Sequence, residues 1–154
     1  MTALTQAAII GGGVIGAGWA ARLVANGVNV RIYDPAPTAA QQIQRVLSQS
    51  RKASAQLYQT PLPPAGQVTF VDTVATAVHD AQLVIESVPE RLADKQAVYV
   101  SIEAAATPDA IIASSTSGIL PSELQSGMQH PGRFLVAHPF NPVYLLPLVE
   151  LVAG

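Results

Sequence analysis

The feature that most constrains the fold is the glycine-rich segment at residues 11–16, which reads Gly-Gly-Gly-Val-Ile-Gly. Residues 7–10 before it form an unbroken apolar run, which predicts a buried β-strand. Residues 14–26 after it have the apolar spacing of one helix face, and Gly27 follows as a helix-ending residue. That face, which we expect to lie in the core, consists of Ile15, Trp19 and Leu23. The pattern therefore predicts a strand, a tight glycine turn and a helix in succession.

The glycine spacing G-x-G-x-x-G is typical of a loop that binds the pyrophosphate of a dinucleotide, provided that a strand precedes it and a helix follows. Gly11 would permit the tight turn, Gly13 would let the backbone approach the pyrophosphate, and Gly16 would let helix and strand pack closely. The free N–H groups at the helix start would attract the anion. The structural alternative is a plain strand-to-helix turn in a protein that binds no ligand.

An acidic residue at the expected distance identifies the dinucleotide more closely. Asp34 follows the next predicted strand, residues 28–33, and comes 23 positions after Gly11. A carboxylate at this place accepts hydrogen bonds from the adenine ribose and repels a 2′-phosphate, and residues 35–38 contain no Arg or Lys to compensate. NAD is therefore favoured over NADP, although Asp34 alone would also be an ordinary turn residue. The residues expected to bind NAD here are Gly11, Gly13, Val14, Ile15, Gly16 and Asp34.

The rest of the chain alternates short apolar runs with amphipathic stretches, which predicts a doubly wound, mainly parallel Rossmann-type α/β sheet with helices on both faces. The expected strands are residues 7–10, 28–33, 68–71, 83–86, 110–114, 134–138 and 148–152. The expected helices are residues 14–26, 36–58, 74–79, 92–106 and 121–125. No repeat or linker interrupts this order, so residues 1–154 are predicted to form one domain.

The composition excludes several other classes of protein. Hydrophobic residues make up 49% of the 154 positions and charged residues 12%, a balance opposite to that of a disordered chain. A net charge of −2 does not indicate the basic surface that binding of nucleic acid requires. The absence of cysteine removes disulfides, thiolate nucleophiles and Cys-ligated zinc, and we expect no metal site. The chain fits a reducing compartment, and we predict the cytoplasm.

A membrane span is the one alternative that the low charge suggests, because residues 1–21 carry no charged side chain. No Lys or Arg precedes this stretch, as a signal or anchor would require. Five of the eight residues from 11 to 18 are glycine, which is unfavourable in a helix interior. We therefore predict no membrane partner.

One histidine is a candidate for proton transfer. Oxidation of an alcohol by NAD requires a base that titrates near physiological pH, and histidine is the usual choice. His79 and His130 lie in short polar segments and are expected to face solvent. His138 ends the predicted strand at residues 134–138, and ligands of open α/β sheets bind outside the carboxyl ends of strands.

Glu150 is the candidate partner of His138. It lies in the apolar run at residues 147–152, where a carboxylate without a partner is costly. An imidazolium at His138 would be one such partner and would be held in one orientation. A structural carboxylate that binds backbone N–H groups is the alternative.

Three motifs resemble one enzyme family. Residues 137–150 read A-H-P-F-N-P-V-Y-L-L-P-L-V-E, residues 114–117 read S-S-T-S, and Glu90 precedes Lys95 by five positions. These are similar to the H-x-F-N-P…L-V-E, S-x-T-S and E-x-x-x-x-K motifs of 3-hydroxyacyl-CoA dehydrogenases, and the resemblance covers nearly the whole chain. It implies an NAD-dependent dehydrogenase that acts on the CH–OH group of a small 3-hydroxy acid.

The resemblance also implies site residues. Catalysis is implied for His138, Glu150 and Ser117, substrate binding for Ser117 and Asn141, and contact with the nicotinamide half of NAD for Glu90 and Lys95. Without the resemblance, Ser117 would be expected to cap a turn. Glu90 would be a helix N-terminal charge and Lys95 a solvated side chain.

Members of this family continue beyond the strand expected at residues 148–152 into a helical domain that forms a dimer and completes the substrate pocket. The resemblance therefore implies that residues 1–154 are an NAD-binding domain truncated at its C-terminal end, and that the full-length protein is a homodimer.

Within the family, residues 138–150 are most similar to the branch that oxidises L-carnitine to 3-dehydrocarnitine. An acyl-CoA or L-gulonate is the alternative substrate. Phe140 and Tyr144 would face a trimethylammonium group or, equally, belong to the core. Two further classes remain open, an NAD-binding fragment without turnover and a crystallin-like structural protein.

Overall fold

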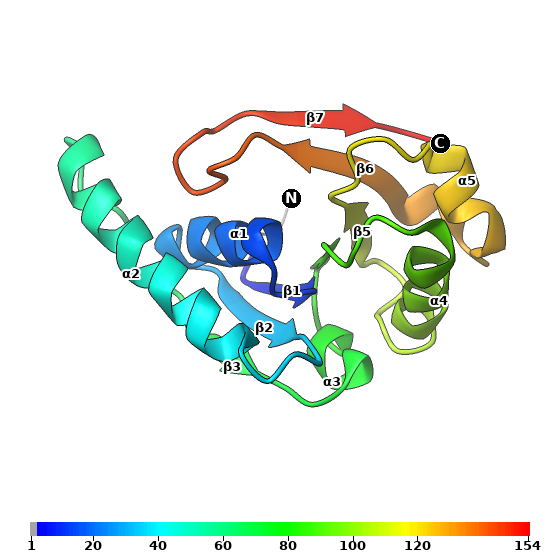
Figure 1. Cartoon of the computed structure of the whole chain (residues 1–154). Helices are drawn as coiled ribbons and strands as arrows, with labels where there is room; N and C mark the ends of the chain where they lie inside the picture. Colours follow the sequence, from blue (N-terminus) through cyan, green and yellow to red (C-terminus); the bar gives the residue numbers. More distant parts are fainter. Residues whose placement is uncertain (1–2) are drawn as a thin grey trace.

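The computed structural model describes residues 3–154 and shows one seven-stranded sheet in the order β3-β2-β1-β4-β5-β6-β7 (Figure 1). The strands are β1 (Gln6–Ile10), β2 (Asn29–Tyr33), β3 (Val68–Phe70), β4 (Leu83–Glu86), β5 (Ile111–Ser114), β6 (Phe134–Pro139) and β7 (Val149–Val152). The helices are α1 (Val14–Ala25), α2 (Ala39–Leu57), α3 (Val74–Val78), α4 (Leu92–Glu103) and α5 (Pro121–Leu124), with two 3-10 helices at Gln125–Gly127 and Pro131–Arg133.

The predicted fold class is confirmed. Strands β1 to β6 pair in parallel and only β7 runs antiparallel, against β6. Helix α2 begins at Ala39, later than expected, because the Asp34 carboxylate accepts a hydrogen bond from the Ala36 N–H and so holds the chain in a turn. Helix α4 ends at Glu103, earlier than the predicted residue 106.

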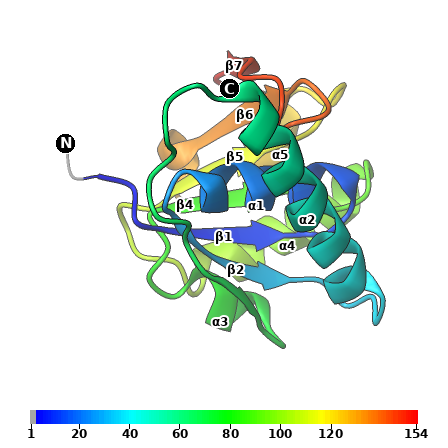
Figure 2. The same ribbon diagram turned by 90° about the vertical axis from the view of Figure 1, so that its left-hand side faces the viewer.

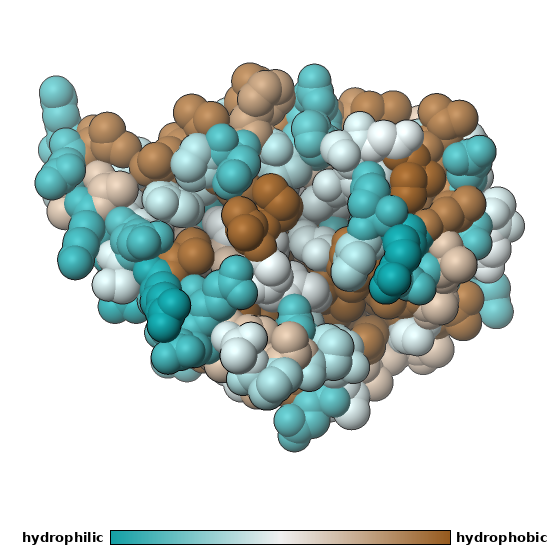
Figure 3. Space-filling view, viewed as in Figure 1, coloured by the Kyte–Doolittle hydropathy of each residue, from teal (hydrophilic) through white to brown (hydrophobic). Residues whose placement is uncertain are grey.

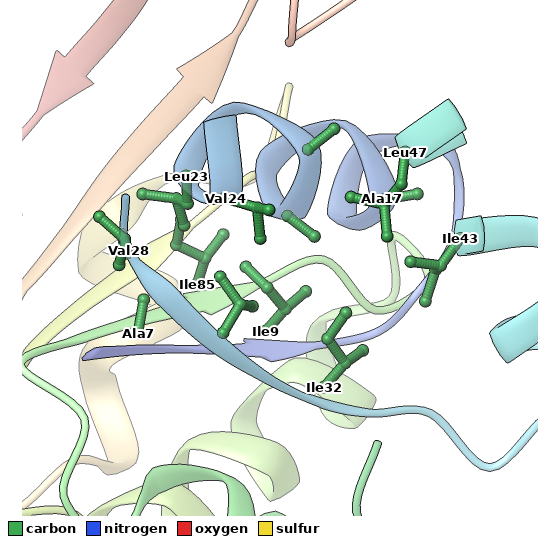
Figure 4. Close-up of a cluster of buried hydrophobic side chains, with 14 of the residues drawn as sticks. Ala7, Ile9, Ala17, Leu23, Val24, Val28, Ile32, Ile43, Leu47 and Ile85 are labelled. Carbon is green, nitrogen blue, oxygen red and sulfur yellow. The ribbon is translucent and has the colours of Figure 1, made fainter. Parts of the chain in front are cut away.

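The core has two layers, one on each face of the sheet (Figures 1 and 2). Helices α1 and α2 cover one face, where alternate residues of β1 and β2 such as Ile9 and Ile32 pack against them (Figure 4). Helices α3 and α4 cover the other face, where Ile10 contacts the second cluster together with Tyr99. Alternate β1 residues thus serve opposite layers, as a strand buried on both faces requires.

The buried face of α1 differs from the prediction. Its buried side chains are small, with Leu23 and Val24 at its C-terminal end, whereas Ile15 and Trp19 are only half-buried. The reason is close packing, since a Cβ at Gly16 would lie 1.9 Å from the Gly11 carbonyl oxygen. The small buried residues are Gly16, Ala17, Gly18, Ala20 and Ala21. Trp19 therefore flanks the core, and its indole N–H donates a hydrogen bond to Ser115 Oγ at 3.2 Å.

Strand β7 forms as predicted, but its apolar run is not buried. It forms the edge of the sheet, where Leu151 is 71% exposed and Val152 is 48% exposed. Figure 3 shows hydrophobic side chains along the upper margin of the molecule, where β7 lies in Figure 1. Glu150 is therefore accessible to solvent rather than enclosed.

Within residues 3–154, no helix has the length and apolar character needed to cross a membrane. Met1 and Thr2, which begin the uncharged stretch noted above, lie outside the described residues.

Candidate functional site

The glycine-rich loop has room only for glycine at its first and last positions. Gly11 has a φ of 97°, in the left-handed region, and a Cβ there would lie 2.6 Å from the Ser87 carbonyl oxygen. Gly16 lies directly against Gly11, as described above. A Cβ at Gly13, in contrast, would meet no atom within 4 Å. Gly13 is thus open toward the space in front of the α1 N-terminus, where a phosphate group would bind.

A cavity of about 730 Å³ adjoins this loop and is lined by Gly11, Gly13 and Asp34. Asp34 Oδ2 accepts a hydrogen bond from the Gly12 N–H at 2.6 Å, and Oδ1 accepts one from the Ala36 N–H at 2.7 Å. Each carboxylate oxygen can accept a second bond, so both remain usable by ribose hydroxyls. An open backbone at Gly13, an adjoining cavity and free acceptor sites on Asp34 are the features that suit an adenosine diphosphate group.

Five residues predicted to bind NAD are not in the lining of this cavity, namely Val14, Ile15, Gly16, Glu90 and Lys95. The Val14 side chain, at the start of α1, is 59% exposed. Ile15 is half-buried on the next position of the helix. Val14 and Ile15 could contact a cofactor only from the first turn of α1, outside the cavity lined by Asp34.

His138 and Glu150 face each other across the antiparallel pair of β6 and β7. They are register partners, and His138 Nδ1 lies 2.8 Å from Glu150 Oε2. The His138 side chain is 33% exposed and that of Glu150 is 59% exposed. Because Nδ1 is engaged by the carboxylate, Nε2 is the ring nitrogen left free for another group.

A second cavity, of about 360 Å³, brings three of the predicted catalytic residues together. Its polar lining includes Ser117, His138 and Glu150, while Leu120 and Val152 contribute apolar surface. Ser117 lies in the loop after β5 and His138 near the end of β6, so the carboxyl ends of adjacent parallel strands converge here. This placement is the usual position of a ligand site in an open α/β sheet.

Glu90 holds the loop that carries Ser117. Its Oε1 accepts hydrogen bonds from the Thr116 hydroxyl, from the Ser117 N–H at 2.9 Å and from the Gly118 N–H at 3.3 Å. Burial alone would raise the pKa of Glu90, but the bonds from Thr116 and Ser117 and the charge of Lys95 lower it to about 2. Glu90 is therefore ionised at neutral pH.

Lys95 is not the solvated side chain that the structural alternative predicted. It is 1% exposed, and its ammonium group lies 2.8 Å from Glu86 Oε1 and 3.2 Å from Glu90 Oε2. Glu86 is itself fully buried and accepts hydrogen bonds from the hydroxyls of Tyr99 and Ser114. Burial, followed by the charge of Glu86, raises the pKa of Tyr99 above its ordinary value, so Tyr99 stays a hydrogen-bond donor.

Glu86, Tyr99 and Ser114 were not predicted to take part in the site, although Ser114 belongs to the S-S-T-S motif. A signal for them was present, because Glu86 ends an apolar strand and Lys95 and Tyr99 are four positions apart on one helix face. A carboxylate at the end of a buried strand, with a lysine on the next helix, indicates an interior ion pair.

The remaining predicted residues lie apart from the cavity that contains His138. Asn141 is exposed in the loop after β6 and is not among the residues lining the cavity. Phe140 is 39% exposed, with its ring centroid 6.3 Å from that of His138, while Tyr144 packs against the core. His79 and His130 are exposed, as expected.

The fold and the glycine loop define a Rossmann-type dinucleotide-binding domain. Residues 6–154 match the family model described as "3-hydroxyacyl-CoA dehydrogenase, NAD binding domain". The chain belongs to the 3-hydroxyacyl-CoA dehydrogenase family, and its cofactor is NAD.

Three relatives show how far the similarity extends. An L-carnitine dehydrogenase/betainyl-CoA thioesterase of Rhizobium sp is 54% identical over 154 residues, which are 100% of this chain and 31% of the relative. An L-carnitine dehydrogenase of Pseudomonas putida is 46% identical over 100% of this chain and 48% of its own length. The solved structure of a 5-formyl-3-hydroxy-2-methylpyridine 4-carboxylic acid 5-dehydrogenase, an NAD+ dependent dismutase, has a TM-score of 0.90 and 40% identity over 99% of this chain and 50% of that one. This chain thus spans about a third to a half of these relatives.

Proposed function

We propose that the protein oxidises the 3-hydroxyl group of L-carnitine to a ketone with NAD as hydride acceptor. The observation that carries this proposal is the His138–Glu150 pair, which faces Ser117 in one cavity at the carboxyl edge of the sheet. The choice of L-carnitine is supported by relatives at 46–54% identity that bear the name L-carnitine dehydrogenase.

His138 acts as the general base in this proposal. Glu150 holds Nδ1 and stabilises the imidazolium, so that Nε2 takes the proton of the substrate hydroxyl. Ser117, which lines the same cavity, donates a hydrogen bond to the same substrate oxygen. The exposed fraction of His138, 33%, allows the proton to pass to solvent afterwards.

The cofactor residues are proposed from the loop geometry. The open backbone at Gly13 and the N–H groups at the start of α1 would hold the pyrophosphate, with Gly16 behind the turn, and Asp34 would bind the adenine ribose. Val14 and Ile15 would add contacts from the first turn of α1, and Glu90 would lie beside the nicotinamide half. When bound, NAD accepts the hydride that leaves the carbinol carbon.

Phe140 is the proposed contact for the trimethylammonium group of L-carnitine. Its exposed ring lies beside His138, whereas Tyr144 packs against the core. A cation over an aromatic face contributes about 0.5–2 kcal/mol. Asn141, in the same exposed loop, is proposed to bind the substrate once the cavity is closed by further residues.

We also propose that the active protein is a cytoplasmic homodimer. The exposed apolar side chains of the β7 edge, Leu151 and Val152, are suited to cover by other protein surface. Sedimentation of the protein expressed from its complete reading frame would give a mass twice that of one chain, and a monomer in active samples would contradict the dimer.

The test of the proposed function is the rate of NADH formation by the protein expressed from its complete reading frame. L-carnitine, 3-hydroxybutyryl-CoA and L-gulonate are compared at equal concentration, and we expect the highest kcat/KM for L-carnitine. A higher kcat/KM for 3-hydroxybutyryl-CoA or L-gulonate would mean that this compound, and not L-carnitine, is the substrate. NADH binding without turnover of any of the three would indicate a protein that binds the cofactor but has another role.

A further inference from the structure

Two serine residues lie between the glycine loop and His138 at the carboxyl edge of the sheet. Ser87 follows β4 and Ser115 follows β5. These two strands lie between β1, which leads into the glycine loop, and β6, which carries His138. The side chains of the two serines are hydrogen-bonded to each other, with their Oγ atoms 3.1 Å apart. Both residues are half-buried, so the pair is within reach of a ligand at this edge.

A dinucleotide bound as proposed must pass over the ends of β4 and β5. Its pyrophosphate would lie at Gly13, and its hydride-accepting ring would have to reach His138, which is three strands away from β1. Adjacent strands are about 4.8 Å apart, so the cofactor must span about 14 Å along the edge. The group that joins the pyrophosphate to the nicotinamide ring is a ribose, whose hydroxyl oxygens accept hydrogen bonds.

Ser87 is in direct contact with the glycine loop. Its N–H donates a hydrogen bond to the Ile10 carbonyl oxygen at 2.8 Å, and its own carbonyl oxygen faces Gly11. Ser87 also lines the cavity that Gly13 and Asp34 line. The strand order reverses between β1 and β4, and ligands of open α/β sheets bind at such a crevice. Ser87 therefore lies where a dinucleotide would cross the sheet.

Trp19, the single tryptophan of the 154 residues, gives the serine pair a direction. Its indole N–H, which can only donate, donates a hydrogen bond to Ser115 Oγ at 3.2 Å. The Ser115 hydroxyl keeps its own proton to donate, and the acceptor that the described residues offer it is Ser87 Oγ. The Ser87 hydroxyl is then left with a proton that it can donate to a ligand.

We propose that the Ser87 hydroxyl donates a hydrogen bond to the nicotinamide ribose of NAD, and that Ser115 and Trp19 are positioning residues that orient this hydroxyl. The inference rests on the proposed function, because it takes the pyrophosphate to bind at Gly13 and the substrate to bind at His138. It adds a contact on the nicotinamide side of the cofactor, separate from that of Asp34 with the adenine ribose.

A comparison of NADH with ADP isolates the nicotinamide ribose, because ADP contains the adenosine and the pyrophosphate but lacks this ribose and its ring. Calorimetric titration measures both affinities for Ser87→Ala and the parent, each expressed from the complete reading frame. We expect Ser87→Ala to weaken NADH binding about fivefold, as for the loss of one neutral hydrogen bond, and to leave ADP binding unchanged. Unchanged NADH affinity, or an equal loss for ADP, would overturn the proposal. Ser48→Ala, at an exposed serine on α2, is the matched control and should leave both affinities unchanged.

A double-mutant cycle tests the positioning role of Trp19. Trp19→Phe keeps an aromatic ring but removes the N–H, and it is combined with Ser87→Ala. We expect Trp19→Phe to weaken NADH binding about threefold in the parent and not at all in the Ser87→Ala background, since coupled residues are non-additive. An equal loss in both backgrounds would mean that Trp19 does not act through Ser87.

Ser115→Ala keeps the test usable if Trp19→Phe fails to fold. It removes the link between the indole and Ser87 while both of these residues remain. We expect a loss of NADH affinity of about threefold, smaller than that of Ser87→Ala, with ADP affinity unchanged. Parental NADH affinity in Ser115→Ala would show that Ser87 is not oriented by this link and would overturn the positioning role.

These measurements are made without substrate, so they separate the two proposals. A parent protein that binds NADH but fails to oxidise L-carnitine would count against the proposed function alone. Equal losses of NADH and ADP affinity in Ser87→Ala, with an active parent, would count against the Ser87 contact alone.

Discussion

Two carboxylate pairs in this molecule have the same length and opposite surroundings. Glu86 and Lys95 are joined at 2.8 Å, and so are Glu150 and His138. The first pair is 0% and 1% exposed in the middle of the fold, while the second is 59% and 33% exposed at the sheet edge. Both carboxylates come from apolar strands, so the difference arises from the position of the strand in the sheet.

Under the proposed function, the buried pair stabilises the fold and the exposed pair transfers protons. A buried pair whose groups are also hydrogen-bonded to Val88, Tyr99 and Ser114 holds a fixed geometry. An exposed pair on an edge strand contributes little to stability, and under the proposed function it takes up and releases a proton during each turnover. Glu90 connects the two, because it binds Lys95 and the loop that carries Ser117.

The largest expected difference between the pairs is in stability. Lys95→Met should lower the free energy of unfolding by about 3–5 kcal/mol, because it leaves Glu86 buried without a partner. Glu150→Gln should change it by at most about 1 kcal/mol, as for exposed ion pairs. Urea unfolding of both variants, with Lys52→Met at an exposed lysine on α2 as the control, measures the contrast. Equal losses for the two pairs would mean that the edge pair also supports the fold.

His138→Gln is expected to affect chemistry without affecting the fold. Turnover should fall at least about 100-fold, the usual contribution of a general base, while NADH affinity stays nearly unchanged. Steady-state kinetics and Trp19 fluorescence titration measure the two quantities. A parallel loss of NADH affinity would assign His138 a role in folding.

Gly13→Ala tests the open face of the glycine loop. The added Cβ meets no protein atom within 4 Å, so stability should stay within about 0.5 kcal/mol of the parent. NADH affinity should fall about tenfold, because the methyl group occupies the space of the pyrophosphate. Calorimetric titration with NADH measures this loss, and full retention of affinity would place the pyrophosphate elsewhere.

The smallest expected effect concerns Glu90 in acid. Its folded-state pKa of about 2 lies below the ordinary value of 4.5, so its contribution to stability is present above about pH 4.5 and is lost as the pH falls toward 2. Solvent screening at the half-exposed side chain keeps this contribution small. The difference in unfolding temperature between parent and Glu90→Gln should therefore shrink from pH 6 to about pH 3. A difference that grows in acid would contradict the lowered pKa of Glu90.

Local patterns were sufficient to predict the fold, because each strand and helix has its own periodicity and the glycine loop fixes the first crossover. The burial of individual residues was harder to predict. Trp19 and Ile15 have the spacing of a core face, yet the close contact of Gly16 with Gly11 leaves room only for small side chains beneath α1. The apolar run of β7 suggested an interior strand, and its edge position depends on the strand order of the whole sheet.

The candidate site was also only partly predictable. The apolar run around Glu150 and the family resemblance suggested a pair with His138, and the structure brings the two together through the register of two strands. Lys95 looked like a surface lysine because its partner, Glu86, lies on a different element and is nine positions away. Ion pairs between elements depend on how the elements pack against each other, and the periodicity of a sequence does not show this packing.

The most direct test of the central claim follows the hydrogen that leaves the substrate. The protein expressed from its complete reading frame is supplied with NAD and with L-carnitine that carries deuterium at C3. We predict one deuterium atom in each molecule of reduced cofactor, seen by mass spectrometry, and at least about 100-fold less deuterated cofactor when His138→Gln replaces the parent at equal times and concentrations. Reduced cofactor without deuterium, or no reduction by the parent, would contradict hydride transfer from the 3-hydroxy carbon.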